Sequence, residues 1–215
     1  MSIPTLDQEV DVVAESVILA GHLNVPSAAK GIVLFAHGSG SSRKSPRNLA
    51  VAKALNKVGL ATLLFDLLST EEESDRANVF DIELLAKRLS DATVWLRQQA
   101  GLAELSVGYF GASTGAAAAL WAAADPKTNV KAVVSRGGRA DMAAAQLAKV
   151  QAPTLLIVGG YDDVVIELNQ QAQAQLHCKN QLVIIPGATH LFEEPGTLEK
   201  VAELASDWFL KYLSH

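Results

Sequence analysis

Apolar and polar residues follow two periods along the chain, and these predict strands and helices in turn. Nearly continuous apolar runs predict buried strands at 31–37, 61–66, 105–110, 131–135, 153–158 and 181–185. Apolar residues spaced three to four apart predict helices at 46–58, 81–99, 116–124, 142–149, 166–176 and 198–213. Two more strands, near 10–14 and 16–23, precede them as an antiparallel lead-in. This alternation predicts an α/β fold with a doubly wound, mostly parallel sheet of about eight strands.

The length of 215 residues suits one full α/β domain, so we expect residues 1–215 to form a single domain. A hydrophobic content of 49% fits a sheet that helices bury on both faces. Between Arg136 and Thr154 there is room for one helix only, so no lid domain is expected there. The site should therefore be open and suited to small substrates.

One strand–turn–helix junction carries candidate chemistry. The segment GYFGASTGAAAAL places Ser113 between Gly111 and Gly115, at the end of an apolar run and just before a helix of small residues. This G-x-S-x-G pattern is typical of a nucleophile elbow, a turn so tight that only tiny residues fit beside the serine. The alternative is an ordinary turn with an idle serine, so the interpretation depends on whether the partners of a nucleophile are present further along the chain.

A serine hydroxyl needs a base to take its proton, and that base needs an orienting acid. Asp162 and Asp163 follow the strand 153–158, and His190 follows the strand 181–185. The order serine, acid, histidine at successive strand ends is the one that this kind of sheet uses. We prefer Asp162 as the acid, because Val165 then packs under the loop, and we expect Asp163 to face solvent or cap the next helix.

Stabilisation of a developing oxyanion requires two backbone N–H groups. We expect one from Thr114, directly after the serine, and one from Ser39 in the glycine-rich segment AHGSGSSRKSPRN. His37 in that segment is expected to brace the backbone. A rival interpretation takes GSGSSR as a dinucleotide-binding loop with Asp66 as the ribose ligand, but the third glycine is missing.

Charge and cysteine content exclude several function classes. A net charge of −5 without a basic stripe argues against nucleic acid as a partner, and residues 71–73 are expected to be a solvated acidic loop. The first residues, MSIPTLDQEV, are not expected to form a signal peptide, and no run is long enough to predict a membrane span. The only cysteine, Cys178, fits a reducing, cytoplasmic location and is interpreted as packing rather than as a catalytic thiol.

Two arginines, Arg136 and Arg139, follow the strand 131–135, next to the strand that ends at the serine. They could form a fork for a carboxylate or phosphate of the substrate. Local pairing, for instance of Arg139 with Asp141, is an equally good interpretation.

With these residues in place, the chain resembles α/β-hydrolases of the dienelactone-hydrolase-like group over nearly its whole length. The segments that carry the resemblance are HGSGSSRKSPRN, GYFGASTGAAAAL, SRGGRADMA, LLIVGGYDD and PGATHLFEEPG. The resemblance implies a triad of Ser113, Asp162 and His190, backbone donors at Ser39 and Thr114, and neither a metal nor an organic cofactor. Dienelactone hydrolases proper carry a cysteine at the elbow, whereas this chain has Ser113, which puts the dienelactone substrate in doubt. Proteins of this kind are also sometimes joined to phosphoribosyltransferase domains.

The residues together predict a cytoplasmic serine hydrolase that cleaves a small ester or lactone through an acyl-enzyme intermediate. Two alternatives stay open. A thioesterase or peptidase would use the same triad. A non-catalytic member of the fold that binds a small molecule or a protein would retain the fold without turnover.

Overall fold

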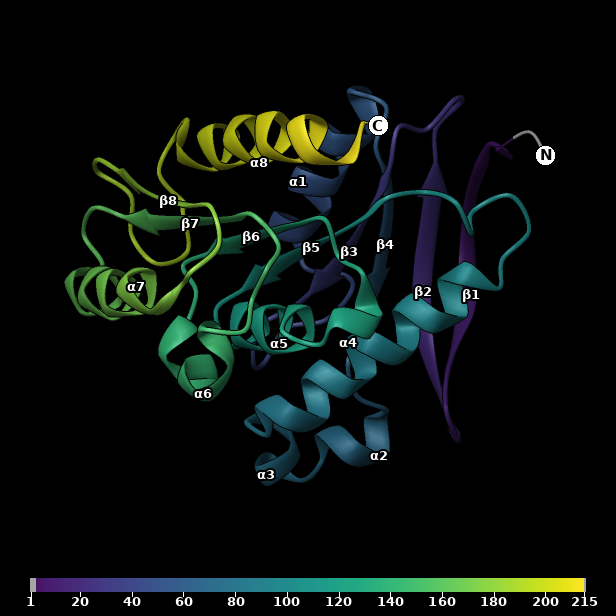
Figure 1. Cartoon of the computed structure of the whole chain (residues 1–215), viewed down its shortest axis with the longest axis horizontal. Helices are drawn as coiled ribbons and strands as arrows, with labels where there is room; N and C mark the ends of the chain where they lie inside the picture. The colour runs from purple at the N-terminus through teal and green to yellow at the C-terminus, as the bar shows by residue number, and fades with distance from the viewer. Residues whose placement is uncertain (1–2, 215) are drawn as a thin grey trace.

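A central eight-stranded sheet organises the computed structural model, which describes residues 3–214 (Figure 1). Residues 1, 2 and 215 lie outside the described part. The strand order is β1-β2-β4-β3-β5-β6-β7-β8. The strands are β1 (Leu6–Ala14), β2 (Val17–Val25), β3 (Ile32–Ala36), β4 (Ala61–Phe65), β5 (Val107–Ala112), β6 (Ala132–Arg136), β7 (Thr154–Gly159) and β8 (Asn180–Ile185). Strand β2 pairs antiparallel with both β1 and β4, and all other neighbours are parallel. The predicted doubly wound, mostly parallel sheet is confirmed.

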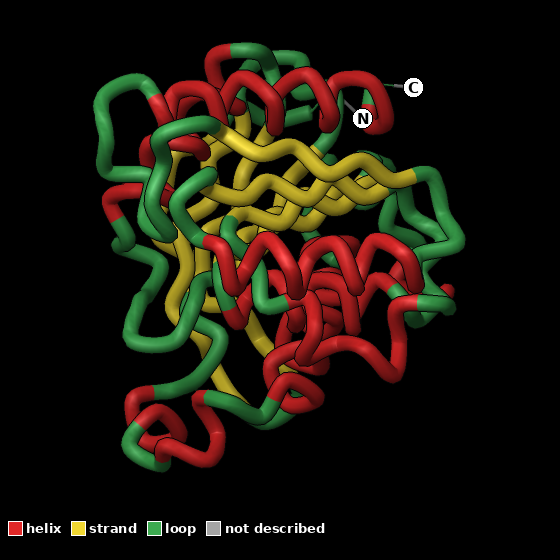
Figure 2. The backbone as a smooth tube through the Cα atoms, turned by 90° about the vertical axis from the view of Figure 1, so that its left-hand side faces the viewer, coloured by secondary structure: helices red, strands yellow, loops and turns green. Residues whose placement is uncertain are grey.

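Helices cover both faces of this sheet (Figures 1 and 2). One apolar core packs α1 and α8 against one face, and the other packs α4, α5 and α7 against the opposite face. The longer helices are α1 (Pro46–Lys57), α4 (Ile82–Arg97), α5 (Thr114–Ala123), α7 (Asp163–Gln175) and α8 (Thr197–Leu213). In residues 3–214, no helix combines the length and the apolar character that a membrane span needs.

The connection from β6 to β7 is short. It holds the 3₁₀ helix η2 (Ala140–Ala143) and the one-turn helix α6 (Ala144–Leu147). No lid is inserted at this point, as expected. The single helix predicted at 142–149 is therefore split and shorter than expected, because its first turn is wound as 3₁₀ rather than α. Another 3₁₀ turn, η1 (Pro126–Thr128), links α5 to β6.

None of the acidic residues 71–73 is buried, as predicted, but the prediction that they form a loop is wrong. These residues belong to α2 (Thr70–Glu73), which α3 (Arg76–Val79) follows. Ser69 and Glu72 form a capping box at the start of α2, and Glu72 also pairs with Arg88 on α4. A four-residue helix is too short to show an apolar period, so the sequence pattern could not reveal it.

Two boundaries matter for the site. Strand β5 extends to Ala112 instead of ending at residue 110, so that Ser113 follows the strand without a spacer. Helix α7 begins at Asp163 instead of near residue 166, which places Asp162 in the short turn between β7 and this helix. Ser113 and Asp162 therefore both lie nearer to the carboxyl ends of their strands than the predicted boundaries implied. Parallel α/β folds place their chemistry at this edge of the sheet.

Candidate active site

Ser113 occupies a sharp turn between β5 and α5. Its backbone angles, φ 52° and ψ −121°, are ones that a residue with a side chain rarely adopts. A methyl group at Gly111 would overlap the backbone of Ala116, and one at Gly115 would overlap the carbonyl oxygen of Ala36. Both glycines are therefore required by close backbone approach, and the turn has the geometry expected of a nucleophile elbow.

Backbone hydrogen bonds from the end of β6 hold this strained residue. The Ser113 N–H donates to the carbonyl of Arg136 at 3.2 Å, and the Ser113 carbonyl accepts from the N–H of Arg139 at 3.0 Å. The side chain of Ser113 is partly exposed, and its hydroxyl forms no hydrogen bond with any residue of the range 3–214. The turn is therefore fixed through its backbone, while the hydroxyl remains available.

Asp162 and His190 form a direct pair. The His190 Nδ1 lies 2.6 Å from Asp162 Oδ2, and the two side chains are 38% and 16% exposed respectively, with histidine the more exposed. Asp163 is exposed as the first residue of α7, and Val165 is buried, as the choice of Asp162 required. The contact leaves Nε2 as the ring nitrogen not engaged by the acid.

The segment that carries His190 is anchored at both ends. The N–H of Tyr161 donates to the carbonyl of Ala188 at 2.9 Å, which joins this segment to the turn that carries Asp162. The N–H and the hydroxyl of Thr189 both donate to the Glu194 carboxylate, at 3.1 and 2.7 Å. The imidazole position is therefore set by several contacts besides that with the acid.

The two predicted oxyanion donors lie together, but they are not equally free. The Ser39 N–H donates to the Thr114 hydroxyl at 2.9 Å, which ties the glycine-rich segment to the first residue of α5. The Thr114 N–H, at the first position of the helix, has no intrahelical acceptor. A substrate oxygen would therefore meet the Thr114 amide, which is free, and the Ser39 amide, which already donates to the Thr114 hydroxyl.

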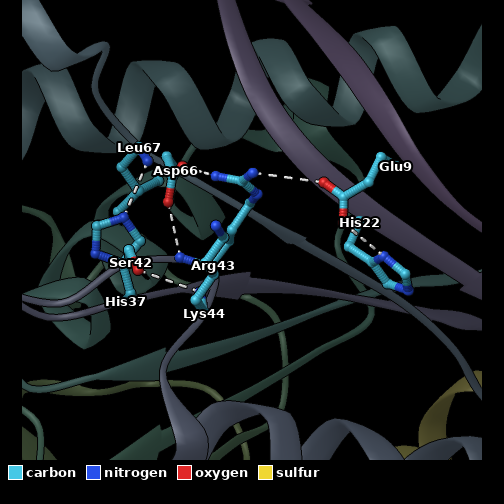
Figure 3. A network of polar contacts seen from close by, with 8 residues as sticks. All are labelled: Glu9, His22, His37, Ser42, Arg43, Lys44, Asp66 and Leu67. Carbon is cyan, nitrogen blue, oxygen red and sulfur yellow. Dashed lines mark hydrogen bonds and ion pairs between the residues drawn. The ribbon is translucent and has the colours of Figure 1, made fainter.

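His37 braces the backbone, as expected. Its Nδ1–H donates to the carbonyl of Gly38 at 3.0 Å. Its Nε2 accepts from the N–H of Leu67 at 3.1 Å (Figure 3). Burial lowers the pKa of the His37 imidazole, which favours the neutral form that these two bonds need. His37 thus links the ends of β3 and β4 and has no free nitrogen for catalysis.

Asp66, the ribose ligand of the rival interpretation, is engaged elsewhere. Its two oxygens accept from the backbone N–H and the Nη1 of Arg43, at 2.7 and 2.6 Å. Figure 3 shows Arg43 reaching on toward Glu9, which in turn contacts His22. These groups hold the segment 37–45 against β1, β2 and β4, so the rival interpretation gains no support.

The two candidate arginines have different surroundings. Arg139 forms a bidentate pair with Asp141, with Nε and Nη2 at 2.9 and 2.8 Å from the carboxylate oxygens. Arg136 is only 7% exposed, and its Nε and Nη1 have no hydrogen-bond partner. Local pairing therefore accounts for Arg139, whereas nothing in the described chain neutralises Arg136.

Cys178 lies away from these residues. Its Sγ is 3.8 Å from the hydroxyl of Thr154, the first residue of β7, whereas Asp162 follows the other end of that strand. Burial raises the pKa of the Cys178 thiol, so it is protonated at neutral pH. Among residues 3–214, no three His, Cys, Asp or Glu side chains converge as metal ligands would.

Sequence reasoning missed three features of the site. They are the Thr114 hydroxyl on the Ser39 amide, the side chain of Arg47 at the start of α1, and Phe192 just after the histidine. The predicted helix 46–58 includes Arg47 and agrees with the start of α1, but no periodic signal indicates which side chain Arg47 approaches.

Known proteins share this architecture. A 67% identical Mycobacterium tuberculosis protein (strain ATCC 25618 / H37Rv), named "Putative phosphoribosyl transferase", matches 98% of this chain. The chain covers 47% of that relative, about half its length. The crystal structure of a dienelactone hydrolase from Anabaena variabilis is 57% identical, with a TM-score of 0.93 over 97% of this chain and 98% of that one.

A lid-less α/β serine hydrolase from Xanthomonas campestris has the same fold, with a TM-score of 0.80 at 20% identity over 100% of this chain and 99% of that one. The family described as "Alpha/beta hydrolase domain" matches residues 29–205, which include every candidate residue named above. The chain belongs to the α/β-hydrolase family.

Proposed function

We propose that this chain is a serine hydrolase that cleaves a small ester or lactone, with Ser113 as nucleophile, His190 as base and Asp162 as orienting acid. The observation that carries the proposal is the 2.6 Å contact between Asp162 and His190, at the same edge of the sheet as the strained Ser113 turn. Relatives with this fold include proteins named as a dienelactone hydrolase and a serine hydrolase, which supports the reaction class.

The proposed reaction has two halves. The Ser113 Oγ attacks the carbonyl carbon while His190 Nε2 takes its proton, and the protonated imidazole then gives that proton to the departing alkoxide, leaving an acyl group on Ser113. Water attacks the acyl carbon in the second half, again losing a proton to Nε2, which returns it to Ser113 as the acid departs. Asp162 keeps the proton of His190 on Nδ1 throughout.

Two features of the resting site must change on binding. The Ser113 hydroxyl is not hydrogen-bonded to His190, so that bond forms with substrate in place, as is common in unliganded hydrolases. The Ser39 N–H donates to the Thr114 hydroxyl, so the substrate carbonyl oxygen displaces this hydroxyl in order to use the Ser39 and Thr114 amides as donors.

Transfer of a phosphoribosyl group is a weaker candidate. The name of the M. tuberculosis relative applies to a protein about twice as long as the matched part, and this chain has an α/β-hydrolase domain over the matched residues. The acid–base pair and the strained serine serve acyl transfer, and thioesters or peptides would be alternative substrates of the same residues.

Labelling with a fluorophosphonate tests the proposal. The reagent forms a covalent adduct only with an activated serine, so we expect one adduct per chain and loss of hydrolysis of 4-nitrophenyl esters in parallel. The tryptic peptide 98–127 contains Ser113 and, as an internal control, Ser106. An adduct on Ser106 would show that Ser113 is not the nucleophile, whereas no adduct together with no ester hydrolysis would favour the non-catalytic binding protein.

A thiol plays no part in this mechanism. We expect Cys178→Ser to hydrolyse esters within about twofold of the wild-type rate and iodoacetamide to leave the wild type active, because the thiol is protonated and lies at the far end of β7. Stoichiometric inactivation by iodoacetamide that the Cys178→Ser variant resists would contradict this prediction.

A further inference from the structure

Arg136 is a buried cation without a partner. Its side chain is 7% exposed, its Nε and Nη1 are unpartnered, and no carboxylate in residues 3–214 lies within ion-pair distance of it. Burying an isolated charge is unfavourable, and native proteins normally pair such groups. Burial and the nearby charge of Arg47 lower the pKa of Arg136 to about 10, so that it is still a cation at neutral pH.

A second cation stands beside it. Arg47 is the second residue of α1, which packs on the same face of the sheet as alternate residues of β6, and its charge contributes to the lowered pKa of Arg136. Its Nε is also buried without a partner, and its single ion pair, with the exposed Glu193 at 3.3 Å, engages Nη1 alone. The first turn of a helix favours anions, and no acidic residue is present in the first turn of α1. Arg136, Arg47 and the start of α1 thus all contribute positive charge on the α1 side of β6.

Phe192, in the segment that follows His190, lies against the Arg136 side chain. Phe192 is 2% exposed although its φ is 54°, a backbone conformation that is strained for a residue with a large side chain. Its ring centre lies 5.9 Å from the Arg136 guanidinium carbon. An aromatic face contacts a cation favourably but leaves its N–H groups without acceptors.

The position relative to the nucleophile can be derived from the strands. Ala132 and Val134 of β6 point to the face that α1 and α8 cover, so Arg136, two residues further, points to the same face. The carbonyl of Arg136 accepts from the N–H of Ser113, and Phe192 lies two residues after His190. The pair of arginines therefore borders the Ser113 turn on its α1 side.

We propose that Arg136 and Arg47 together bind a carboxylate or phosphate group of the substrate, so that the preferred ester or lactone is anionic. The proposal rests on the serine-hydrolase function and names its substrate class. A carboxylate or phosphate group would accept hydrogen bonds from both guanidinium groups and would neutralise Arg136, whose charge no carboxylate of the described chain compensates. The fork is formed by Arg136 with Arg47, whereas the sequence suggested Arg136 with Arg139.

The first experiment measures anion binding without chemistry. In the Ser113→Ala background, sodium chloride is replaced by inorganic phosphate at constant ionic strength and thermal unfolding is followed. We expect the Tm to rise by about 3 °C when phosphate is tenfold above its dissociation constant. Arg136→Met and Arg47→Gln should abolish the rise, whereas Lys44→Gln, which removes an exposed charge from the same segment, should retain it. An equal rise in the two arginine variants would overturn the site.

The second experiment measures selectivity in the otherwise wild-type enzyme. Mono-4-nitrophenyl glutarate is compared with 4-nitrophenyl valerate for the acyl side, and 4-acetoxybenzoate and 4-acetoxyphenyl phosphate with methyl 4-acetoxybenzoate for the leaving side. We expect Arg136→Met to lower kcat/KM for an anionic ester about ten- to a hundredfold and to leave the neutral partner near wild type. The two leaving-side anions distinguish a carboxylate from a phosphate.

The two experiments separate the possible failures. Phosphate stabilisation that depends on both arginines, without an anionic preference on either side, would overturn the assignment to the substrate. Absence of hydrolysis of even the neutral esters, with phosphate stabilisation intact, would contradict the serine-hydrolase function and not the anion site. If Arg136→Met does not fold, Arg47→Gln is used for both tests, because the Arg47 side chain is 32% exposed and its replacement by glutamine disturbs the core less.

Discussion

Ser113→Ala is expected to lower kcat for ester hydrolysis on the order of 10⁶-fold, the loss seen when the serine of another Ser-His-Asp hydrolase is removed. The remaining groups then have no nucleophile whose proton they could take, and only oxyanion stabilisation persists. Stability should change little, because alanine has the same Cβ and the lost hydroxyl has no hydrogen-bond partner in residues 3–214. Initial rates with 4-nitrophenyl esters and urea unfolding measure the two effects.

Ser113→Gly is the matched control for backbone strain. Glycine accepts φ 52° and ψ −121° without the penalty that a Cβ brings, so the free energy of unfolding should rise by about 1 kcal/mol while activity is lost as in the alanine variant. The contrast separates the cost of holding the serine in this turn from its chemical role. Turnover retained in either variant would show that another residue is the nucleophile.

Asp162→Asn is expected to lower kcat about 10⁴-fold. The asparagine amide can donate to the Nδ1 of His190, which would move the ring proton to Nε2, the nitrogen that must accept the proton of Ser113. The loss should therefore fall on kcat much more than on KM, which steady-state kinetics with a neutral ester will show. The 2.6 Å contact between Asp162 and His190 is the geometric basis of this prediction.

Asp163→Asn is the control for charge, because it removes the same carboxylate one residue later. Asp163 is exposed at the start of α7 and has no contact with His190, so the rate should stay within about twofold. A small loss of stability is expected, since a carboxylate in the first turn of a helix is worth about 0.3–1 kcal/mol. Reversed severities of the two variants would assign the acid to Asp163.

Much of the fold could be predicted because its signals are local. Buried parallel strands are continuous apolar runs, and amphipathic helices repeat at three to four residues, so alternation along the chain was enough to predict the eight-stranded sheet. The close approach of α5 to β5 similarly requires Gly111 and Gly115, which marks Ser113 in the sequence itself. Short helices such as α2 escape this reasoning, since one turn contains no period.

The sequence by itself determined which residues reach the carboxyl edge of the sheet, because strand ends and tight turns are properties of consecutive residues. Only the tertiary structure decided what each side chain meets there. The pairing of Arg139 with Asp141, the Thr114 hydroxyl on the Ser39 amide, and Arg47 beside Arg136 depend on which segments lie next to one another and on side-chain rotamers. Arg47 and Arg136 are 89 residues apart in the sequence, yet their charges interact through space. No pattern along the chain indicates that two such distant residues interact.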